Sequence, residues 1–384
     1  MTRDAIAAEE IFRRAQAIGQ YYGFRSFASL AQKKRGQPKK DSPEVTLPAG
    51  LDPAAESVAG FLRQLAGADI TLVPREPVFL WHSNLTPGRS GPKNAVIQLH
   101  ALGAERAIAD AVLIRAARAL VFDLYKIEPE VRLNSMGDKE TRARFARELG
   151  TFFRKRGPML PEDCTNCAKR DVFEAAELLI SRETSEDLPS PTDHLSDASR
   201  KRFEELLDYL ETTDTPYALT PELLSRGNAW NEMCFEVRLP AQAGIENTPV
   251  AWGSRYSELA KHFFKSAPPA AAVVIRIPSD GGEIAAAKNP RTRFAFVHIG
   301  EEAKRASIMV TEELKRARIP LMQMIGIESL SEQMRFAEAL NPPYLLIMGR
   351  KEALEHSAIL RNRTTHEETV LPILGLADRL KGVA

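Results

Sequence analysis

The stretch that decides the fold is residues 221–259, PELLSRGNAWNEMCFEVRLPAQAGIENTPVAWGSRYSEL. A short apolar run rich in strand-forming residues follows Arg226, and residues 240–249 form a connection with proline at both ends. A second short apolar run then leads into residues 253–256, GSRY. This pattern predicts two strands and the start of a helix. It places Arg226 and Arg255 at strand-to-turn junctions, where side chains are often available to a ligand.

The composition is that of an ordinary folded protein. With 384 residues the chain is long enough for two domains, and its 44% hydrophobic and 27% charged residues exclude global disorder. The formal charge of +1 provides no overall attraction to nucleic acid, so RNA binding would require a local basic patch. Three cysteines favour a reducing, cytoplasmic location. No apolar window predicts a membrane span, and the charged start is not that of a signal peptide.

Two segments of the opening stretch resemble the histidine-recognition segments of histidyl-tRNA synthetases. They are residues 225–236 and 252–259, which match an Arg-Gly-Leu-Asp-Tyr-Tyr strand and a Gly-Gly-Arg-Tyr-Asp-Gly-Leu turn in that family. The resemblance implies a catalytic role for Arg226 and ligand contacts for Arg255 and Tyr256. The first segment is one residue shorter than in the family, and the aspartate and two tyrosines of the amino-acid pocket are replaced by Ala229, Trp230 and Asn231.

Residues 77–105 resemble the second motif of class II synthetases, two antiparallel strands joined by a loop. In the family an arginine on the first strand binds the ATP α-phosphate, because a fixed bidentate donor stabilises the charge that builds up there. The best alignment places Trp81 at this position, and an indole cannot replace a guanidinium. The family's glutamine is replaced by Ala101, whereas Glu105 is retained and is a candidate ligand contact. Arg89 in the loop is either a phosphate contact or a solvated surface residue.

Two further class II segments are altered. Residues 47–65 resemble the family's Leu-Arg-Pro-Glu-Gly-Thr-Ala segment, but Asp52 replaces the arginine, and Glu56 is the nearest candidate for the carboxylate that holds the substrate amine. Residues 265–283 correspond to the third motif. Arg276 is present there as a candidate ligand contact, but Ala and Val replace the glycines and no Glu-Arg pair follows, which favours a core strand.

Other segments identify the subfamily and the domains. Residues 132–153 closely resemble a strand-and-helix segment found in histidyl-tRNA synthetases, and residues 329–349 strongly resemble the family's anticodon-binding domain. We therefore expect an α+β class II synthetase core over residues 1–285, with a mixed, mainly antiparallel sheet, flanking helices and a helical insertion at about 160–215. A C-terminal α/β anticodon-binding-like domain is expected over residues 286–384. Cys164 and Cys167 form a lone C-x-x-C pair; a zinc site needs about four ligands, so no metal site is predicted.

The substitutions at ligand positions bear on function. Our leading hypothesis is a histidyl-tRNA synthetase-like protein that is weak or inactive in aminoacylation and acts by binding tRNA, a small ligand or a protein partner. One alternative is an active, divergent histidine–tRNA ligase that uses ATP and Mg²⁺ and brings in a displaced arginine such as Arg89. Others are a regulatory subunit of the ATP phosphoribosyltransferase type and a dimeric scaffold. The family resemblance also implies a homodimer.

Overall fold

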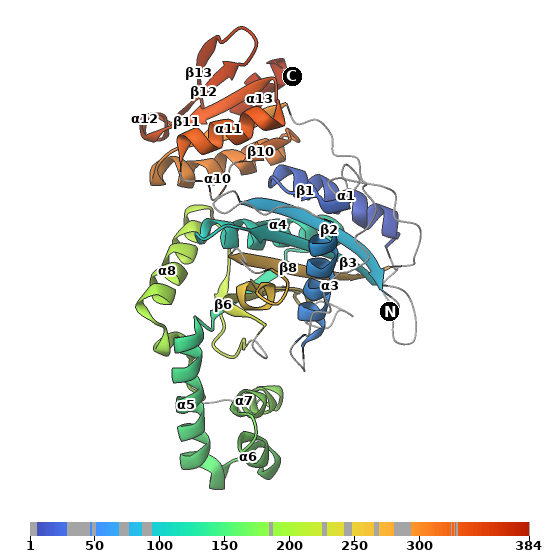
Figure 1. Ribbon diagram of the computed structural model, residues 1–384, viewed down its shortest axis with the longest axis vertical. Helices are drawn as coiled ribbons and strands as arrows, with labels where there is room; N and C mark the ends of the chain where they lie inside the picture. Colours follow the sequence, from blue (N-terminus) through green and yellow to red (C-terminus); the bar gives the residue numbers. More distant parts are fainter. Residues whose placement is uncertain are drawn as a thin grey trace.

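The computed structural model contains two β-sheets with helices packed against them (Figure 1). It describes residues 6–28, 47, 51–68, 77–86, 94–183, 187–224, 229–241, 248–264, 269–279, 293–323, 325, 327 and 329–383. The predicted positions of Arg89 and Arg226, and the expected domain boundary between residues 285 and 286, lie outside these ranges.

The larger sheet has eight strands in the order β1-β2-β3-β8-β7-β6-β4-β5. Its neighbours pair antiparallel except at the two ends, where β1 runs parallel to β2 and β5 parallel to β4. The predicted core with a mainly antiparallel sheet is therefore confirmed. The strands are β1 (Arg25–Ser26), β2 (Val78–Thr86), β3 (Asn94–Leu102), β4 (Glu130–Ser135), β5 (Ala218–Leu219), β6 (Asn231–Leu239), β7 (Thr248–Arg255) and β8 (Ala270–Pro278).

The helices of this part begin where the sequence supplies capping groups. The Asp52 carboxylate accepts hydrogen bonds from the backbone N–H groups of Ala54 and Ala55 at the start of one helix, and Asp138 caps another in the same way. The helices are α1 (Ala8–Tyr21), α3 (Pro53–Gly67), α4 (Ile108–Tyr125), α5 (Lys139–Arg156), α6 (Glu162–Ala168), α7 (Val172–Ser181), α8 (Asp197–Thr212) and α9 (Ser257–Ala260), with short 3₁₀ turns at Gly157–Met159 and Pro191–His194.

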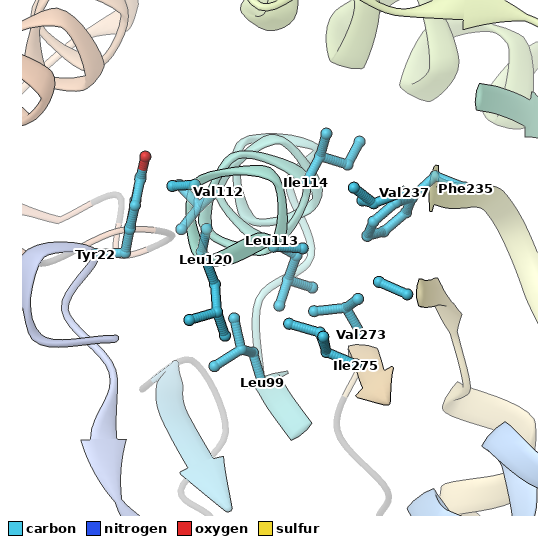
Figure 2. Close-up of a cluster of buried hydrophobic side chains, with 14 of the residues drawn as sticks. Tyr22, Leu99, Val112, Leu113, Ile114, Leu120, Phe235, Val237, Val273 and Ile275 are labelled. Atoms are coloured by element: carbon cyan, nitrogen blue, oxygen red, sulfur yellow. The ribbon is translucent and has the colours of Figure 1, made fainter. Parts of the chain in front are cut away.

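The two faces of the large sheet are covered by different helices. Helix α4 lies across one face and packs on alternate residues of the central strands, among them Leu99, Val273 and Ile275 (Figure 2). Helix α3 covers part of the opposite face and packs on the intervening residues, which include Leu80 and Val274. Because side chains alternate along a strand, each position of β2, β3, β7 and β8 belongs to one face or the other.

Helices α5, α6 and α7 extend away from the sheet as a separate helical unit (Figure 1). Their apolar side chains form a core of their own around Phe145 and Leu149. The thiols of Cys164 and Cys167 are buried in this core, which also includes Cys234 of strand β6. Burial raises the pKa of both Cys164 and Cys167.

The smaller sheet forms the C-terminal domain, in the strand order β10-β9-β11-β12-β13. Strand β9 pairs parallel with β10 and β11, as the predicted strand–helix–strand pattern requires, and β12 and β13 continue antiparallel. None of the described helices is long and apolar enough to cross a membrane. The elements are β9 (Phe294–His298), α10 (Glu301–Arg316), β10 (Leu321–Gln323), α11 (Leu330–Leu340), β11 (Tyr344–Met348), α12 (Arg350–Leu354), β12 (Ser357–Asn362), β13 (Glu368–Pro372) and α13 (Leu376–Val383).

Candidate functional site

A cavity of about 500 Å³ lies on the face of the large sheet that α3 covers. Its floor is a row of side chains that are neighbours across three strands, Glu236 on β6, Trp252 on β7 and Val274 on β8. The start of α3 forms one wall and α7 contributes another. The core sheet and the helical unit therefore enclose this cavity together. We refer to it below as the sheet-face cavity.

The described residues that line the sheet-face cavity carry more negative than positive charge. Its carboxylates come from Asp52, Glu177, Glu222 and Glu236, and its one cationic side chain is that of Arg276. Burial raises the pKa of Glu236, while Arg238, whose Nε lies 3.1 Å from a Glu236 carboxylate oxygen, acts in the opposite direction. The electrostatic potential of this lining favours a ligand with a positive group and opposes a polyanion.

Arg276 is the predicted ligand contact that the structure places in the cavity. Its guanidinium donates hydrogen bonds to the carbonyl oxygen of Pro53 and, at 3.0 Å, to Ser57 Oγ, both in the first turn of α3. Burial lowers the pKa of Arg276, and the nearby charges of Asp52 and Glu56 oppose that shift. Glu56 itself is exposed in the same turn, close enough to Arg276 to interact electrostatically.

Two residues that depart from the family pattern contact each other. The indole Nε1 of Trp230 donates a 2.5 Å hydrogen bond to the Asp52 carboxylate, the same carboxylate that caps α3. Trp230 is only 2% exposed and packs beneath α3 with Ala229. The substituted segment thus fills space next to the cavity with a large apolar ring, and Asp52 satisfies its single donor.

Tyr256 belongs to a buried polar chain under α3. Its hydroxyl lies 2.9 Å from His100 Nδ1, and His100 Nε2 lies 3.1 Å from Gln98 Oε1. The Phe61 ring stacks on the His100 ring at a centroid distance of 3.7 Å. Tyr256 is 0% exposed and packs between α3 and the sheet, so its position does not support the predicted contact with a ligand.

Trp81, which the sequence aligned with the family's phosphate-binding arginine, does not reach the sheet-face cavity. Trp81 pairs with Leu99 and packs under α1, in the core on the α4 side of the sheet, so it faces away from the sheet-face cavity. Ala101 lies on that same far side. On the cavity side, β2 presents Leu80 and His82 instead.

Strand β2 nevertheless supplies no cation to the cavity side. Its sequence, VFLWHSNLT, contains neither arginine nor lysine. Burial lowers the pKa of His82 to about 4, so this side chain is neutral at pH 7. Strand β2 therefore has no charged group for a phosphate on the side of Trp81 or on the side of His82.

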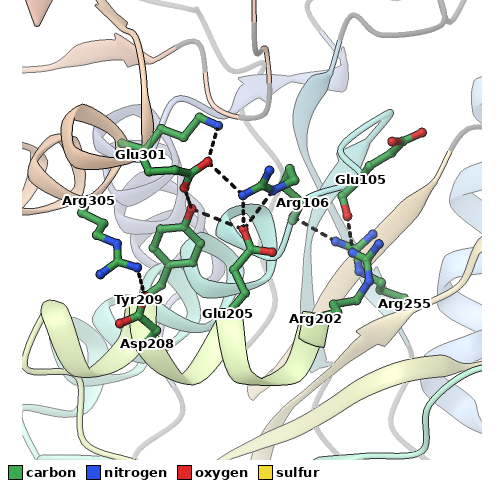
Figure 3. Close-up of polar contacts among 10 residues, drawn as sticks. Glu105, Arg106, Arg202, Glu205, Asp208, Tyr209, Arg255, Glu301 and Arg305 are labelled. Atoms are coloured by element: carbon green, nitrogen blue, oxygen red, sulfur yellow. Dashed lines mark hydrogen bonds and ion pairs between the residues drawn. The ribbon is translucent and has the colours of Figure 1, made fainter. Parts of the chain in front are cut away.

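Arg255 lies on the far side as well and is fully engaged there. Its guanidinium pairs with the Asp110 carboxylate at 2.9 Å and donates to the carbonyl oxygens of Ala104 and Arg106. Figure 3 draws its hydrogen bond to the carbonyl oxygen of Arg106. At 2% exposure it ties β7 to α4, and its position does not support the predicted ligand contact.

Glu105 is separated from the other candidate residues. Its side chain is exposed, and its backbone carbonyl oxygen accepts a hydrogen bond from Arg202 of α8 (Figure 3). It lines a different hollow, between α8 and the start of α10. Of the seven predicted site residues, the structure therefore brings Arg276 and Glu56 together and places Glu105 elsewhere.

The sequence did not identify Glu236, Trp252, Glu177 and Glu222 as lining residues. For Glu236 and Trp252 a signal was available, because both lie on predicted strands on either side of the 240–249 connection and pair directly across them. The sequence carries no such signal for Glu177 and Glu222, because only folding brings their segments next to the sheet. Among the described residues there is no group of three or more His, Cys, Asp or Glu arranged to hold a metal ion.

Comparison with known proteins agrees with this architecture. The family model of the anticodon binding domain matches residues 293–382. The histidine–tRNA ligase of Thermosipho melanesiensis is 26% identical over 277 residues, 70% of this chain and 64% of the ligase, so this chain spans less than two thirds of that relative's length. Histidine–tRNA ligase 1 of Shouchella clausii is 23% identical over 342 residues, 85% of this chain and 80% of the ligase.

Among solved structures, apo histidyl-tRNA synthetase of S. aureus aligns with 97% of this chain and 95% of its own, with 17% identity and a TM-score of 0.49. The chain is therefore similar in sequence to histidine–tRNA ligases, and its residues 293–382 match the anticodon binding domain.

Proposed function

We propose that this chain is a member of the histidyl-tRNA synthetase family that binds a small amine-bearing ligand on the sheet face and does not activate it with ATP. The observation that carries the proposal is the charge of the sheet-face cavity, where four carboxylates and one guanidinium line the described surface. A cavity of about 500 Å³ with Trp252 and Val274 on its floor suits a small ligand that has an apolar body.

The chemistry of amino-acid activation explains why ATP is disfavoured. The reaction places a polyanionic triphosphate on the sheet and needs fixed cations where charge develops at the α-phosphorus. Strand β2 offers neutral His82, and the Asp52 carboxylate stands where the family has an arginine. ATP and Mg²⁺ belong to the alternative of an active ligase, for which a displaced arginine such as Arg89 would have to supply the missing charge.

A ligand with an amine has a partner in the cavity. An ammonium group of the ligand would pair with the partly buried Glu236 on β6. A carboxylate on the same molecule would face Arg276 on β8, which is separated from β6 by β7. The separation of one acidic and one basic group across the floor matches the two charges of an amino acid. Histidine is the natural probe because the relatives are histidine–tRNA ligases.

Calorimetric titration of the full chain with L-histidine and with histamine tests this proposal. Binding of either ligand is expected, and Glu236→Gln should weaken it about tenfold because a charge-assisted contact is lost. The exposed Glu355 on the C-terminal domain provides the control, since Glu355→Gln changes the net charge equally and should leave binding unchanged. No heat of binding with either ligand, or equal affinity of the Glu236→Gln variant, would reject the proposal.

A second function is favoured by the C-terminal domain, namely RNA binding. The match of residues 293–382 to the anticodon binding domain supports a tRNA partner for this part of the chain. A protein partner, homodimer formation and a cytoplasmic location stay predictions. Gel-shift titration with histidine tRNA and with an unrelated tRNA of equal length would separate specific binding from the general attraction of a polyanion.

A further inference from the structure

A second and larger cavity, of about 780 Å³, lies between the core and the C-terminal domain. Its walls come from α1, α4 and the last turn of α10 with the residues that follow it. Eight arginine and lysine side chains and three carboxylates line it. We refer to it as the interdomain cavity. Its lining is opposite in sign to that of the sheet-face cavity.

Arg115 of α4 is the most buried cation of the interdomain cavity. Its side chain is 5% exposed, and its Nη2 atom lies 2.8 Å from Glu312 Oε1 on α10. Its Nε and Nη1 atoms are buried and have no hydrogen-bond partner among the described residues. A guanidinium with two such donors is costly to bury, because only one part of its charge is compensated.

The single carboxylate of Glu312 is shared by several groups. Besides Arg115, it accepts a hydrogen bond from the Tyr22 hydroxyl and lies 3.4 Å from Lys315 Nζ. Burial opposes ionisation of Glu312, but Arg115 and Lys315 lower its pKa to about 2, so it is charged at neutral pH. One negative charge therefore faces the buried Arg115 and the partly buried Lys315, and the local balance stays positive.

Neighbouring side chains bring further charge. Arg118 lies one helical turn after Arg115 and forms an ion pair with Glu128 of the same lining, but its buried Nε has no hydrogen-bond partner among the described residues. Burial together with Arg115 lowers the pKa of Arg118. The same repulsion acts on Lys315, whose pKa is lowered by burial and further by Arg115 and Arg118. These cations repel one another and are held close together by the fold. A bound anion would reduce the repulsion and stabilise their charged forms.

Two cations of the lining remain available to a ligand. Arg316 and Arg318, at the end of α10, have no ion pair within the described part of the chain. Tyr21 and Phe122 also line the cavity, and Phe122 is 44% exposed, a high value for so large an apolar side chain. The lining thus combines guanidinium donors with aromatic surface.

We infer that the interdomain cavity binds a small phosphate-bearing molecule, held by Arg118, Lys315 and Arg316. Guanidinium groups form bidentate hydrogen bonds with phosphoryl oxygens, and a compact anion with two or more charges matches the surplus of the lining better than a single carboxylate does. The volume suits a nucleotide or an inorganic oligophosphate, which present the same chemistry. This inference does not depend on the function of the sheet-face cavity.

Binding of inorganic pyrophosphate and of ADP to the full chain tests the inference, with calorimetry in buffer of constant ionic strength. The variants are Arg118→Gln and Arg316→Gln, and the control is Arg379→Gln on α13, an exposed arginine away from the cavity. Each cavity variant should weaken binding about tenfold, since each removes a charged hydrogen bond, and the control should bind like the unaltered chain. Circular dichroism verifies that the variants are folded.

The two ligands distinguish the sources of the phosphate. Tighter binding of ADP than of pyrophosphate, lost in the cavity variants, assigns the cavity to a nucleotide, and equal binding assigns it to the phosphate groups alone. The inference is overturned if neither ligand binds, if sodium chloride at matched ionic strength competes fully, or if the control variant loses as much affinity as the cavity variants. Binding of tRNA without binding of either small ligand would overturn it too.

Discussion

Asp52 has two structural tasks, although its sequence position suggests a lost catalytic arginine. It caps α3 through two backbone N–H groups and accepts the indole N–H of Trp230, a residue 178 positions away in the sequence. Each interaction alone contributes little to the unfolding free energy, but both depend on the Asp52 carboxylate. Asp52 and Trp230, which both depart from the family pattern, are therefore physically coupled, and the effect of substituting one should depend on the other.

Replacement of Asp52 by alanine is expected to destabilise the protein by about 2–4 kcal/mol, the sum of a lost N-cap and a buried indole donor without a partner. Asp52→Asn is the matched variant. Its amide oxygen can keep the cap of α3, but its NH₂ group cannot accept the indole N–H of Trp230, which bonds to the other carboxylate oxygen of Asp52. The asparagine variant should therefore lose about 1–3 kcal/mol, less than the alanine variant. Urea unfolding of the two variants gives both values, and an unfolding free energy of Asp52→Asn equal to that of the unaltered chain would show that the indole contact has no energetic weight.

The sequence alone did not tell on which side of a strand a candidate residue lies. Arg255 and Tyr256 are adjacent and were both expected to contact a ligand, and they lie on opposite sides of the sheet. Trp81 and Leu80 are divided in the same way, because a shift of one residue moves a side chain to the other face. The contact of Trp230 with Asp52 had no local signal, since only folding brings the two segments together.

At the scale of single elements the sequence was a better guide. The strands on either side of the 240–249 connection form where their apolar runs predicted them, and the pair that becomes β2 and β3 forms where the family resemblance implied two strands. Strong periodic patterns depend on many residues at once, so one error does not change them. The walls of the cavities depend instead on single side chains from distant elements.

Strand β9, in the centre of the smaller sheet, carries a histidine that should make stability depend on pH. His298 is 0% exposed, and its two ring nitrogens have no partner among the described residues. Burial, aided by Lys304, lowers its pKa to about 4. The unfolded chain binds this proton near pH 6.5 whereas the folded chain does not, so stability is full above that pH and is lost as pH falls toward 4.

Replacement of His298 by leucine should flatten this dependence. Between pH 6.5 and 4, the unfolding free energy of the variant is expected to fall less steeply, by up to about 1.4 kcal/mol per pH unit. Denaturant unfolding at several pH values measures the slopes. The exposed His356 supplies the control, because His356→Gln should retain the steep fall. A His298→Leu slope equal to that of the unaltered chain would contradict the buried, neutral state of this histidine.

At the scale of the whole molecule, the core and the C-terminal domain meet along α10. Near its start, Glu301 accepts a hydrogen bond from Arg106, and Arg305 pairs with Asp208 of α8 (Figure 3). Near its end, Glu312 meets Arg115 and Tyr22. Exposed pairs of the first kind contribute little individually, so the buried group around Glu312 is the stronger link. A ligand in the interdomain cavity would contact both domains.

The sheet-face cavity and the interdomain cavity differ in charge, and that difference underlies the account of function. The carboxylates line the sheet-face cavity, while the cations gather between the domains. A synthetase needs the opposite arrangement at its catalytic sheet.

Histidine-dependent exchange of pyrophosphate into ATP measures adenylate formation directly and tests this claim on the full chain. A histidine–tRNA ligase assayed in the same buffer with Mg²⁺ supplies the positive reference. We predict exchange no greater than that seen without histidine, because the sheet lacks the charge that stabilises the reacting phosphate. Exchange that requires histidine and rises in proportion to the amount of this protein would contradict the account.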